Sequence, residues 1–286
     1  MRETLIAVIT LVVAPLIGGL LFGIDRKITA RMQRRVGPPI LQPFYDILKL
    51  IGKDRIVTNK AQLIWAYGYL FFVMASLIML FLGQDLLMLV FVLAFGGISF
   101  ILGGFSTKSP YSHIGANREI MQMVSYEPVL ILMAVGVYLV NGSFIIKDIF
   151  TKTPLLVNLW PIFIAVLVIL TIKMRKSPFD ISTSHHAHQE IVKGITTEYS
   201  GPYLALIELT HWYELILVLG LISLFWATPL WIGILIALGS FILELFVDNI
   251  SARMYYAWMV KFTWGIGLTL CVINIVWLLL VKQGVI

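Results

Sequence analysis

Acidic and imidazole side chains lie along two stretches of this chain at spacings that suit proton or ion transfer. Glu208, His211 and Glu214 follow one another in steps of three, which places neighbours within about 60° around a helix. Glu244 and Asp248 are four residues apart and stack on one helical face. Both stretches are otherwise apolar, and ionisable groups inside such segments indicate an ion pathway by default.

Two further acids, Glu119 and Glu127, come just before an apolar run that begins at Pro128. With Met123 they are spaced at i, i+4 and i+8, broadly along one side of a helix. A carboxylate at a membrane boundary needs a partner, unless it reaches back to water as a helix-end acid. The spacing leaves both interpretations open.

A long polar stretch, from Arg175 to Pro202, contains three closely spaced histidines. His185, His186 and His188 precede Glu190. His185 and His188 with Glu190 could bind a metal, although a structural zinc site prefers a second ligand pair, and none is evident. The histidines could equally contact a polar cytoplasmic partner, or relay protons in a pH-sensitive way.

The elements that must position these residues are membrane helices. The chain has 286 residues, of which 59% are hydrophobic and only 13% charged, against roughly 25% charged in soluble domains. We therefore expect an all-α, polytopic membrane protein that forms a single domain over residues 1–286. Eight apolar runs are long enough to cross a bilayer, and they cover residues 4–24, 63–82, 86–105, 128–146, 155–172, 202–227, 230–247 and 262–281.

The basic residues predict the orientation of these helices. Of the 21 Lys and Arg residues, 17 fall in the segments after the first, third, fifth and seventh runs. The positive-inside rule then places these long segments in the cytoplasm and both termini outside. A nucleic-acid-binding surface would not divide its charge by loop parity, so we expect no nucleic acid partner.

Cysteine content limits the redox chemistry of the chain. Cys271 is the single cysteine and lies in an apolar run, where a packing role is expected. An iron–sulfur cluster needs about four thiolates, so we expect no cofactor or metal bound by this chain alone. The sequence also lacks a nucleophile triad and a phosphate-binding loop, so we expect no catalysis by the isolated chain.

The first cytoplasmic segment predicts an amphipathic helix. Leu41, Phe44, Ile47, Leu48 and Ile51 recur at helical spacing, with charged residues among them. The helix could anchor the chain to the lipid surface. Alternatively, charged residues of this segment could meet a partner or line a cavity, namely Arg26, Arg31, Arg34, Arg35, Asp46 and Lys49.

The same segment carries a family resemblance. The run RMQRRVGPP, followed by LQPFYDILKL, resembles the signature of the NuoH family, the membrane subunits of respiratory complex I. Arg118, Gln122 and Ser125-Tyr126-Glu127 also resemble that family, as do Pro178-Phe179-Asp180 and Glu198-Tyr199-Ser200-Gly201.

The resemblance implies roles for several residues. Glu127, Glu190 and Glu198 would belong to an acidic route into the membrane, and Asp180 to a cavity near the redox site of a partner. Arg118 would belong to the same interface. The sequence departs from the family at Pro128, where valine is usual, and at His211, where an acid is usual.

Two departures resemble one branch of the family. Only Pro39 and Ile40 separate Gly37-Pro38 from the Leu-Gln-Pro motif, and the run His-His-Ala-His-Gln-Glu ends at Glu190. Both resemble the membrane anchor of energy-converting [NiFe] hydrogenases. The implied partners are hydrogenase-like large and small subunits, an iron–sulfur subunit and antiporter-like membrane subunits, with iron–sulfur clusters and a nickel–iron centre in those partners.

The sequence is also compatible with other functions. A subunit of a sulfane-sulfur reductase or of a quinone-reducing complex I would carry similar motifs. A free-standing secondary transporter would need paired broken helices in inverted halves, which are not visible. A purely structural anchor would tolerate neutralisation of its acids without loss of ion pumping.

Overall fold

The computed structural model describes residues 2–150, 154–179, 182 and 193–283, and these residues are almost entirely helical. Within them there is no strand, only an isolated bridge between Asp85 and Ile145. In this described part of the chain, eight helices are long and apolar enough to cross a membrane, which confirms the all-α polytopic fold. The orientation of the termini stays a prediction.

The predicted spans agree closely with most of the long helices. Helix α4 (Leu86–Phe105) has the predicted bounds, and α3 (Lys60–Phe81), α7 (Leu156–Lys173), α8 (Gly201–Ser223) and α9 (Leu230–Ile250) differ by a few residues. The first helix, α1 (Arg2–Met32), is longer than predicted. The last span is built from α10 (Tyr256–Phe262), the π-helix η4 (Thr263–Leu268) and α11 (Thr269–Lys282).

The fourth span differs most from the prediction. Helix α5 covers Pro110–Asn141 and passes through Pro128, where the sequence predicts a start. Pro110 lies in its first turn, where the missing N–H is not needed, and Gly142 ends it in the left-handed conformation. The separate short helix α6 (Ile146–Ile149) follows. The early start places Glu119 within this long helix, where it is buried in the bundle, rather than in a segment that precedes the span.

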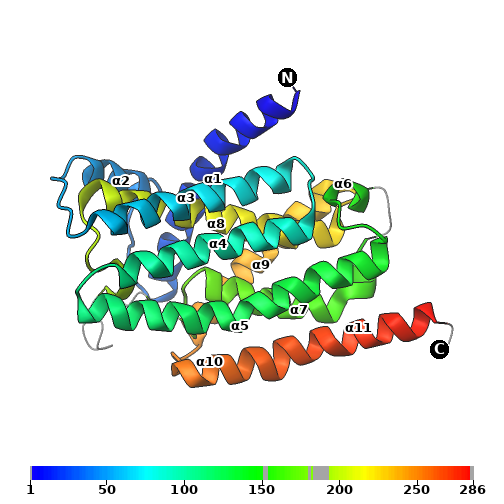
Figure 1. Ribbon diagram of the computed structural model, residues 1–286. Helices are drawn as coiled ribbons and strands as arrows, with labels where there is room; N and C mark the ends of the chain where they lie inside the picture. Colours follow the sequence, from blue (N-terminus) through cyan, green and yellow to red (C-terminus); the bar gives the residue numbers. More distant parts are fainter. Residues whose placement is uncertain (1, 151–153, 180–181, 183–192, 284–286) are drawn as a thin grey trace.

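The predicted amphipathic helix is confirmed as α2 (Gln42–Ile51). Phe44 packs edge-on against Trp212 of α8 with ring centroids 5.1 Å apart, whereas Leu48 and Ile51 are exposed. Figure 1 shows α2 and the starts of α5 and α10 at one end of the bundle, and α6 and the C-terminus at the other. We call the end with α2 the inner end.

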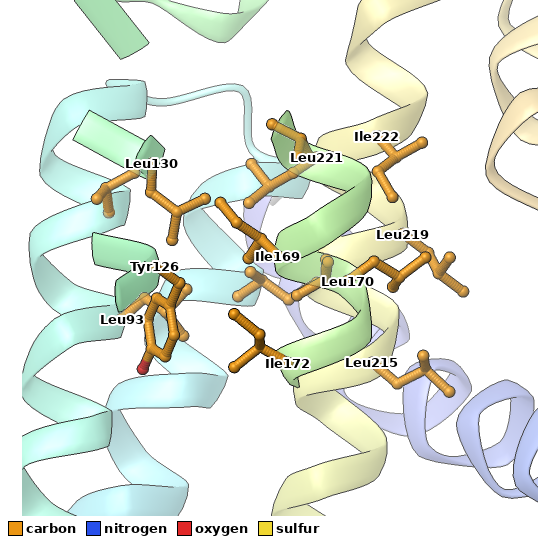
Figure 2. Packing of buried hydrophobic residues seen from close by; sticks show 14 of the residues in the cluster. Leu93, Tyr126, Leu130, Ile169, Leu170, Ile172, Leu215, Leu219, Leu221 and Ile222 are labelled. Atoms are coloured by element: carbon orange, nitrogen blue, oxygen red, sulfur yellow. The ribbon is translucent and has the colours of Figure 1, made fainter. Parts of the chain in front are cut away.

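The core lies where α7 meets α5 and α8. Ile169 and Leu170 of α7 are buried beside Leu215 of α8 and Leu130 of α5 (Figure 2). By contrast, α1 and α9 keep many large apolar side chains exposed, as expected for helices that face lipid. This packing fixes the end of α7, and with it the cations that follow.

Candidate functional site

A cavity of about 500 Å³ opens at the inner end of the bundle. Its walls come from α1, α2, α8, α9 and the segment that follows α7. The charged residues that line it are Asp25, Arg26, Asp46, Lys49, Lys53, Lys173, Arg175, Lys176, Lys193, Glu208, Asp248 and Arg253, together with His211.

The most buried ion pair in this region belongs to the Lys173 cluster, which we define as Lys173, Glu214, Tyr126 and Tyr69. The Lys173 ammonium donates to Glu214 Oε1 at 2.7 Å and to the Tyr126 hydroxyl at 2.8 Å. The Tyr69 hydroxyl donates to Glu214 Oε2 at 2.9 Å. The Lys173 and Glu214 side chains are only 7% and 5% exposed, and burial makes each charge of such an ion pair depend on its partner.

Arg175 extends the polar interior toward α5. Its guanidinium lies 3.5 Å from Glu119 Oε1, contacts His211 Nε2, and stacks 4.8 Å from the centre of the Phe100 ring. Since a guanidinium only donates, His211 Nε2 accepts, and the proton of a neutral imidazole then lies on Nδ1, which faces Glu208 Oε2 at 3.9 Å. Burial alone would lower the pKa of Arg175, but Glu119 and nearby acids raise it above its usual value, so Arg175 stays charged.

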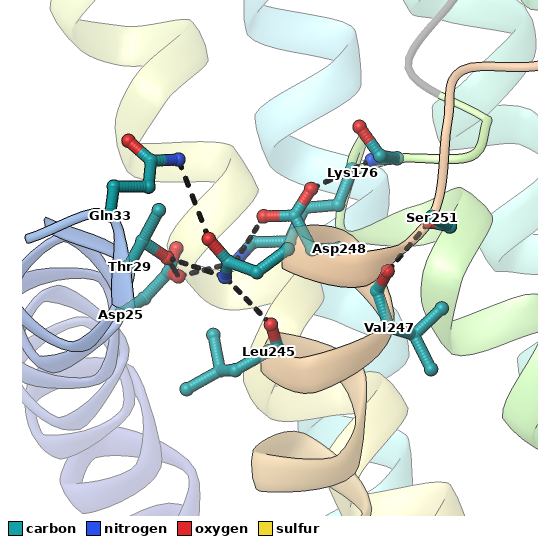
Figure 3. Close-up of polar contacts among 10 residues, drawn as sticks. Asp25, Thr29, Gln33, Lys176, Leu245, Val247, Asp248 and Ser251 are labelled. Atoms are coloured by element: carbon teal, nitrogen blue, oxygen red, sulfur yellow. Dashed lines mark hydrogen bonds and ion pairs between the residues drawn. The ribbon is translucent and has the colours of Figure 1, made fainter. Parts of the chain in front are cut away.

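The Lys176 cluster, which we define as Lys176, Asp25 and Asp248, joins α1 to α9 (Figure 3). Lys176 contacts Asp25 Oδ1 and lies 3.5 Å from Asp248 Oδ2. Asp248 also accepts from the Ser177 N–H at 2.9 Å, and Asp25 from the Thr29 hydroxyl at 3.3 Å. The segment 173–176 therefore connects α7 to α1, α5, α8 and α9 through three cations.

The rim of the cavity carries an exposed ion pair. Arg26 of α1 donates to Asp46 of α2 at 2.6 Å, with side chains that are 45% and 39% exposed. Gln42 donates to the other oxygen of Asp46 at 3.1 Å. Charged groups thus continue from the surface of α2 to the interior between the helices.

Three acids have buried oxygens without a hydrogen-bond partner within the described part of the chain. Both carboxyl oxygens of Glu127 are in this state, as are Oε1 of Glu244 and Oε2 of Glu119, whose other oxygen faces Arg175. Lys173 is the charged group whose electrostatic influence reaches Glu127. For Glu244, the largest electrostatic influence from a charged group is that of Lys176. Each lysine cluster therefore has one unpaired carboxyl close by.

The structure brings together most of the predicted ion-pathway residues. Glu208, His211 and Asp248 line the cavity, Glu119 and Glu214 pair with its cations, and Glu127 and Glu244 have buried carboxyl oxygens near the two clusters. Among the predicted interface residues, Arg26, Asp46 and Lys49 line the cavity.

Other predicted residues lie elsewhere. Arg31 and Arg35 are exposed near the end of α1, and Arg118 and Glu198 are partly exposed. None of these four lines the cavity. Asp180, His185, His186, His188 and Glu190 lie outside the described residues.

The sequence interpretation misses the cations of the site. It treats Lys173, Arg175 and Lys176 only as loop charges that set the topology, and it gives no role to Asp25 or Tyr69. A usable signal exists, because three cations follow directly after an apolar run in a chain whose other runs contain acids. Within residues 2–150, 154–179, 182 and 193–283, no three His, Cys, Asp or Glu side chains are grouped to hold a metal.

The fold and this site define a class of protein: a multi-pass membrane protein with a charged cavity at one end and ion pairs between its helices. The comparison with protein families specifies the class. Residues 4–279 match the model of the NADH dehydrogenase family, and the chain belongs to that family. It is a membrane subunit of the complex I-like and hydrogenase-like kind.

Subunits of hydrogenase-type complexes and of NADH-quinone oxidoreductases are both similar to this chain. Hydrogenase-4 component C of Escherichia coli (strain K12) is 35% identical over 218 residues, which cover 70% of this chain and 66% of that protein. The H subunit of the NADH-quinone oxidoreductase of Thermomicrobium roseum is 30% identical over 301 aligned positions, with 88% and 87% covered. Formate hydrogenlyase subunit 4 of Escherichia coli (strain K12) is 32% identical, with 68% and 67% covered.

A solved structure shares the fold. A chain of the membrane-bound sulfane sulfur reductase, an archaeal respiratory membrane complex, superposes with a TM-score of 0.88 over 97% of this chain and 100% of that chain. The two sequences are 23% identical. This likeness supports the arrangement of the helices and carries no statement about the substrate.

Proposed function

We propose that this chain is the membrane anchor and ion-coupling subunit of a respiratory complex whose redox module is of the [NiFe]-hydrogenase type. One observation carries the proposal. Charged groups line one cavity from the exposed Arg26–Asp46 pair at its rim to Lys173, which pairs with the buried Glu214. Buried charges are costly, and in membrane proteins they accompany ion pathways.

The redox module would dock at the inner end, which the positive-inside rule assigns to the cytoplasm. This end presents α2, whose outer face exposes Tyr45, Leu48 and Ile51, and the rim of the charged cavity. Iron–sulfur clusters and the nickel–iron centre would belong to the large, small and iron–sulfur subunits. The similarity to hydrogenase-4 component C and formate hydrogenlyase subunit 4 supports this type of partner.

Ion transfer would use the acids between the helices. Glu208, His211 and Glu119 would receive the change in charge at the cavity, and Glu214 and Glu127 would pass it between α8 and α5. Asp248 and Glu244 provide a second set on α9. Antiporter-like subunits in the cell membrane would receive the ion, while this chain performs no catalysis itself.

The experiment purifies the complex through a tag on this chain and measures nickel, the co-purifying subunits and ion transport into vesicles. Glu214→Gln should leave assembly and soluble electron transfer intact and abolish transport. Glu3→Gln is the matched control, because Glu3 is an exposed acid, 69% exposed, paired with Lys147 at 3.6 Å. Normal transport in Glu214→Gln would identify a purely structural anchor.

The nickel measurement separates the branches. A complex that contains nickel and produces or consumes hydrogen agrees with the proposal. A complex without nickel contradicts the hydrogenase assignment, and turnover with sulfane sulfur or with a quinone then shows which module is attached.

A further inference from the structure

Glu127 stands apart from the other carboxyls of the interior. It follows Tyr126 on α5, and both of its oxygens are buried with no hydrogen-bond partner among the described residues. A buried carboxylate without a cation or a donor carries a large cost. Glu127 is therefore the carboxyl near the Lys173 cluster that is suited to hold a proton.

Charge balance around Lys173 supports the same assignment. Lys173 and Arg175 are the two buried cations here, and Glu214 and Glu119 are the carboxylates paired with them. Glu127 is a third carboxyl. Two cations can offset two carboxylates, so the third carboxyl is neutral as long as the other two are charged.

Lys173 pairs with Glu214 and also acts electrostatically on Glu127. Its ammonium spans α8 and α5, because it bonds both to Glu214 and to Tyr126, the residue before Glu127. The ammonium lies over the Tyr126 ring, 4.0 Å from the ring centre. A lysine is a compact charge with three donors on a flexible four-carbon stem. A change of side-chain conformation could therefore move the Lys173 ammonium from Glu214 toward Glu127 while it stays in contact with the Tyr126 ring.

We propose that Lys173 is a two-position switch that decides which of two acids, Glu214 on α8 or Glu127 on α5, holds a proton. In the arrangement seen here Lys173 pairs with the Glu214 carboxylate, and Glu127 carries the proton. In the other arrangement Lys173 pairs with Glu127. Glu127 then loses its proton and Glu214 gains one, so one proton crosses from α5 to α8 and the total charge is unchanged.

The position of Lys173 is linked to the segment that would face the redox module. Lys173 ends α7, and two residues later Arg175 adopts a positive φ of 53°. Such a conformation is unfavourable for a residue other than glycine and persists when surrounding contacts hold it. Those contacts are Glu119 and His211. A displacement of residues 176–179, which follow Arg175, would release these contacts and move Lys173.

The switch rests on the proposed function, but its test does not require transport. Infrared difference spectra of the purified complex would record the C=O stretch of protonated carboxyl groups. Glu127→Gln should remove one such band. Glu214→Gln should remove the same band, because Lys173 is then free to pair with Glu127. Lys173→Met should add the area of one carboxyl, because both acids then hold protons.

Controls separate this switch from a structural ion pair. Glu244→Gln changes an acid beside the other lysine and should leave the Glu127 band in place. If the Glu127 band persists in Glu214→Gln, Lys173 does not exchange partners and the proposal is wrong.

A second variant is available if Glu214→Gln fails to assemble. Glu214→Asp keeps the negative charge on a shorter side chain, so a larger fraction of the molecules should have Lys173 paired with Glu127, and the Glu127 band should weaken. An unchanged band there would also contradict the switch. If a Glu214 variant loses transport while its infrared bands stay unchanged, the switch is contradicted and the proposed function is still supported.

Discussion

Lys173 and Lys176 are three residues apart, yet each meets a different set of partners. Lys173 contacts one carboxylate and one phenol and is almost completely buried. Lys176 lies between two carboxylates, Asp25 and Asp248, of which Asp248 is 20% exposed. Lys176 is therefore held from two sides, whereas Lys173 has an uncharged partner on one side and an unpaired acid nearby.

The difference shows that burial and partner type, rather than distance, decide what an ion pair does. The exposed Arg26–Asp46 pair is as short, at 2.6 Å, as the buried Lys173–Glu214 pair at 2.7 Å. Water competes for the first pair and not for the second. Three substitutions test this comparison, from the deepest pair to the most exposed.

The largest effect is expected for Lys173→Met. This change removes the cation of Glu214, which must then take up a proton to stay buried, at a cost on the order of 3–5 kcal/mol. The midpoint of thermal unfolding of the purified complex should fall clearly. The double variant Lys173→Met/Glu214→Gln should recover most of the loss, because the side chain at position 214 then needs neither a cation nor a proton. A single variant as stable as the unchanged protein would contradict the pairing.

Lys176→Met should have an intermediate effect. Asp25 and Asp248 lose a cation, but Asp248 keeps the Ser177 N–H and lies at the cavity, where water reaches it. We expect a loss of about 1–3 kcal/mol, measured by the same unfolding midpoint. A larger loss than that of Lys173→Met would reverse the order of the two clusters.

The smallest effect on stability is expected for Asp46→Asn at the rim. An exposed ion pair contributes about 0–1 kcal/mol, so the unfolding midpoint should hardly move. Docking of soluble subunits, measured by their co-purification, should weaken if the rim is an interface. Leu48→Ser on the exposed face of α2 would probe the apolar side of the same surface. An unfolding midpoint that falls as far as that of Lys173→Met would show that Asp46 supports the fold itself.

The helices are largely predictable because each signal is local. A run of about 20 apolar residues predicts a span wherever it occurs, and α4 agrees with its prediction at both ends. The start of α5 is not predictable in this way, because residues 110–127 are too polar to read as a span. Their polarity is offset by partners from distant parts of the chain, among them Arg175 for Glu119.

The candidate site is predictable only in its acids. Glu214 is identified from its position inside an apolar run, but its partners Lys173 and Tyr69 lie 41 and 145 residues away in the chain. Glu198 is assigned to the ion route by resemblance, and the structure places it outside the cavity lining. Spacing along one helix predicts which residues share a face and does not predict which face another helix will cover.

The sequence by itself determined that this chain is a bundle of membrane helices that carries acids at a solvation cost, because hydropathy and charge act residue by residue. Only the tertiary structure decided which cation meets which acid, because that depends on how α7 packs against α5 and α8. The same packing directs the three cations at the end of α7 to four other helices, and it leaves Glu127 and Glu244 with buried, unbonded oxygens beside them.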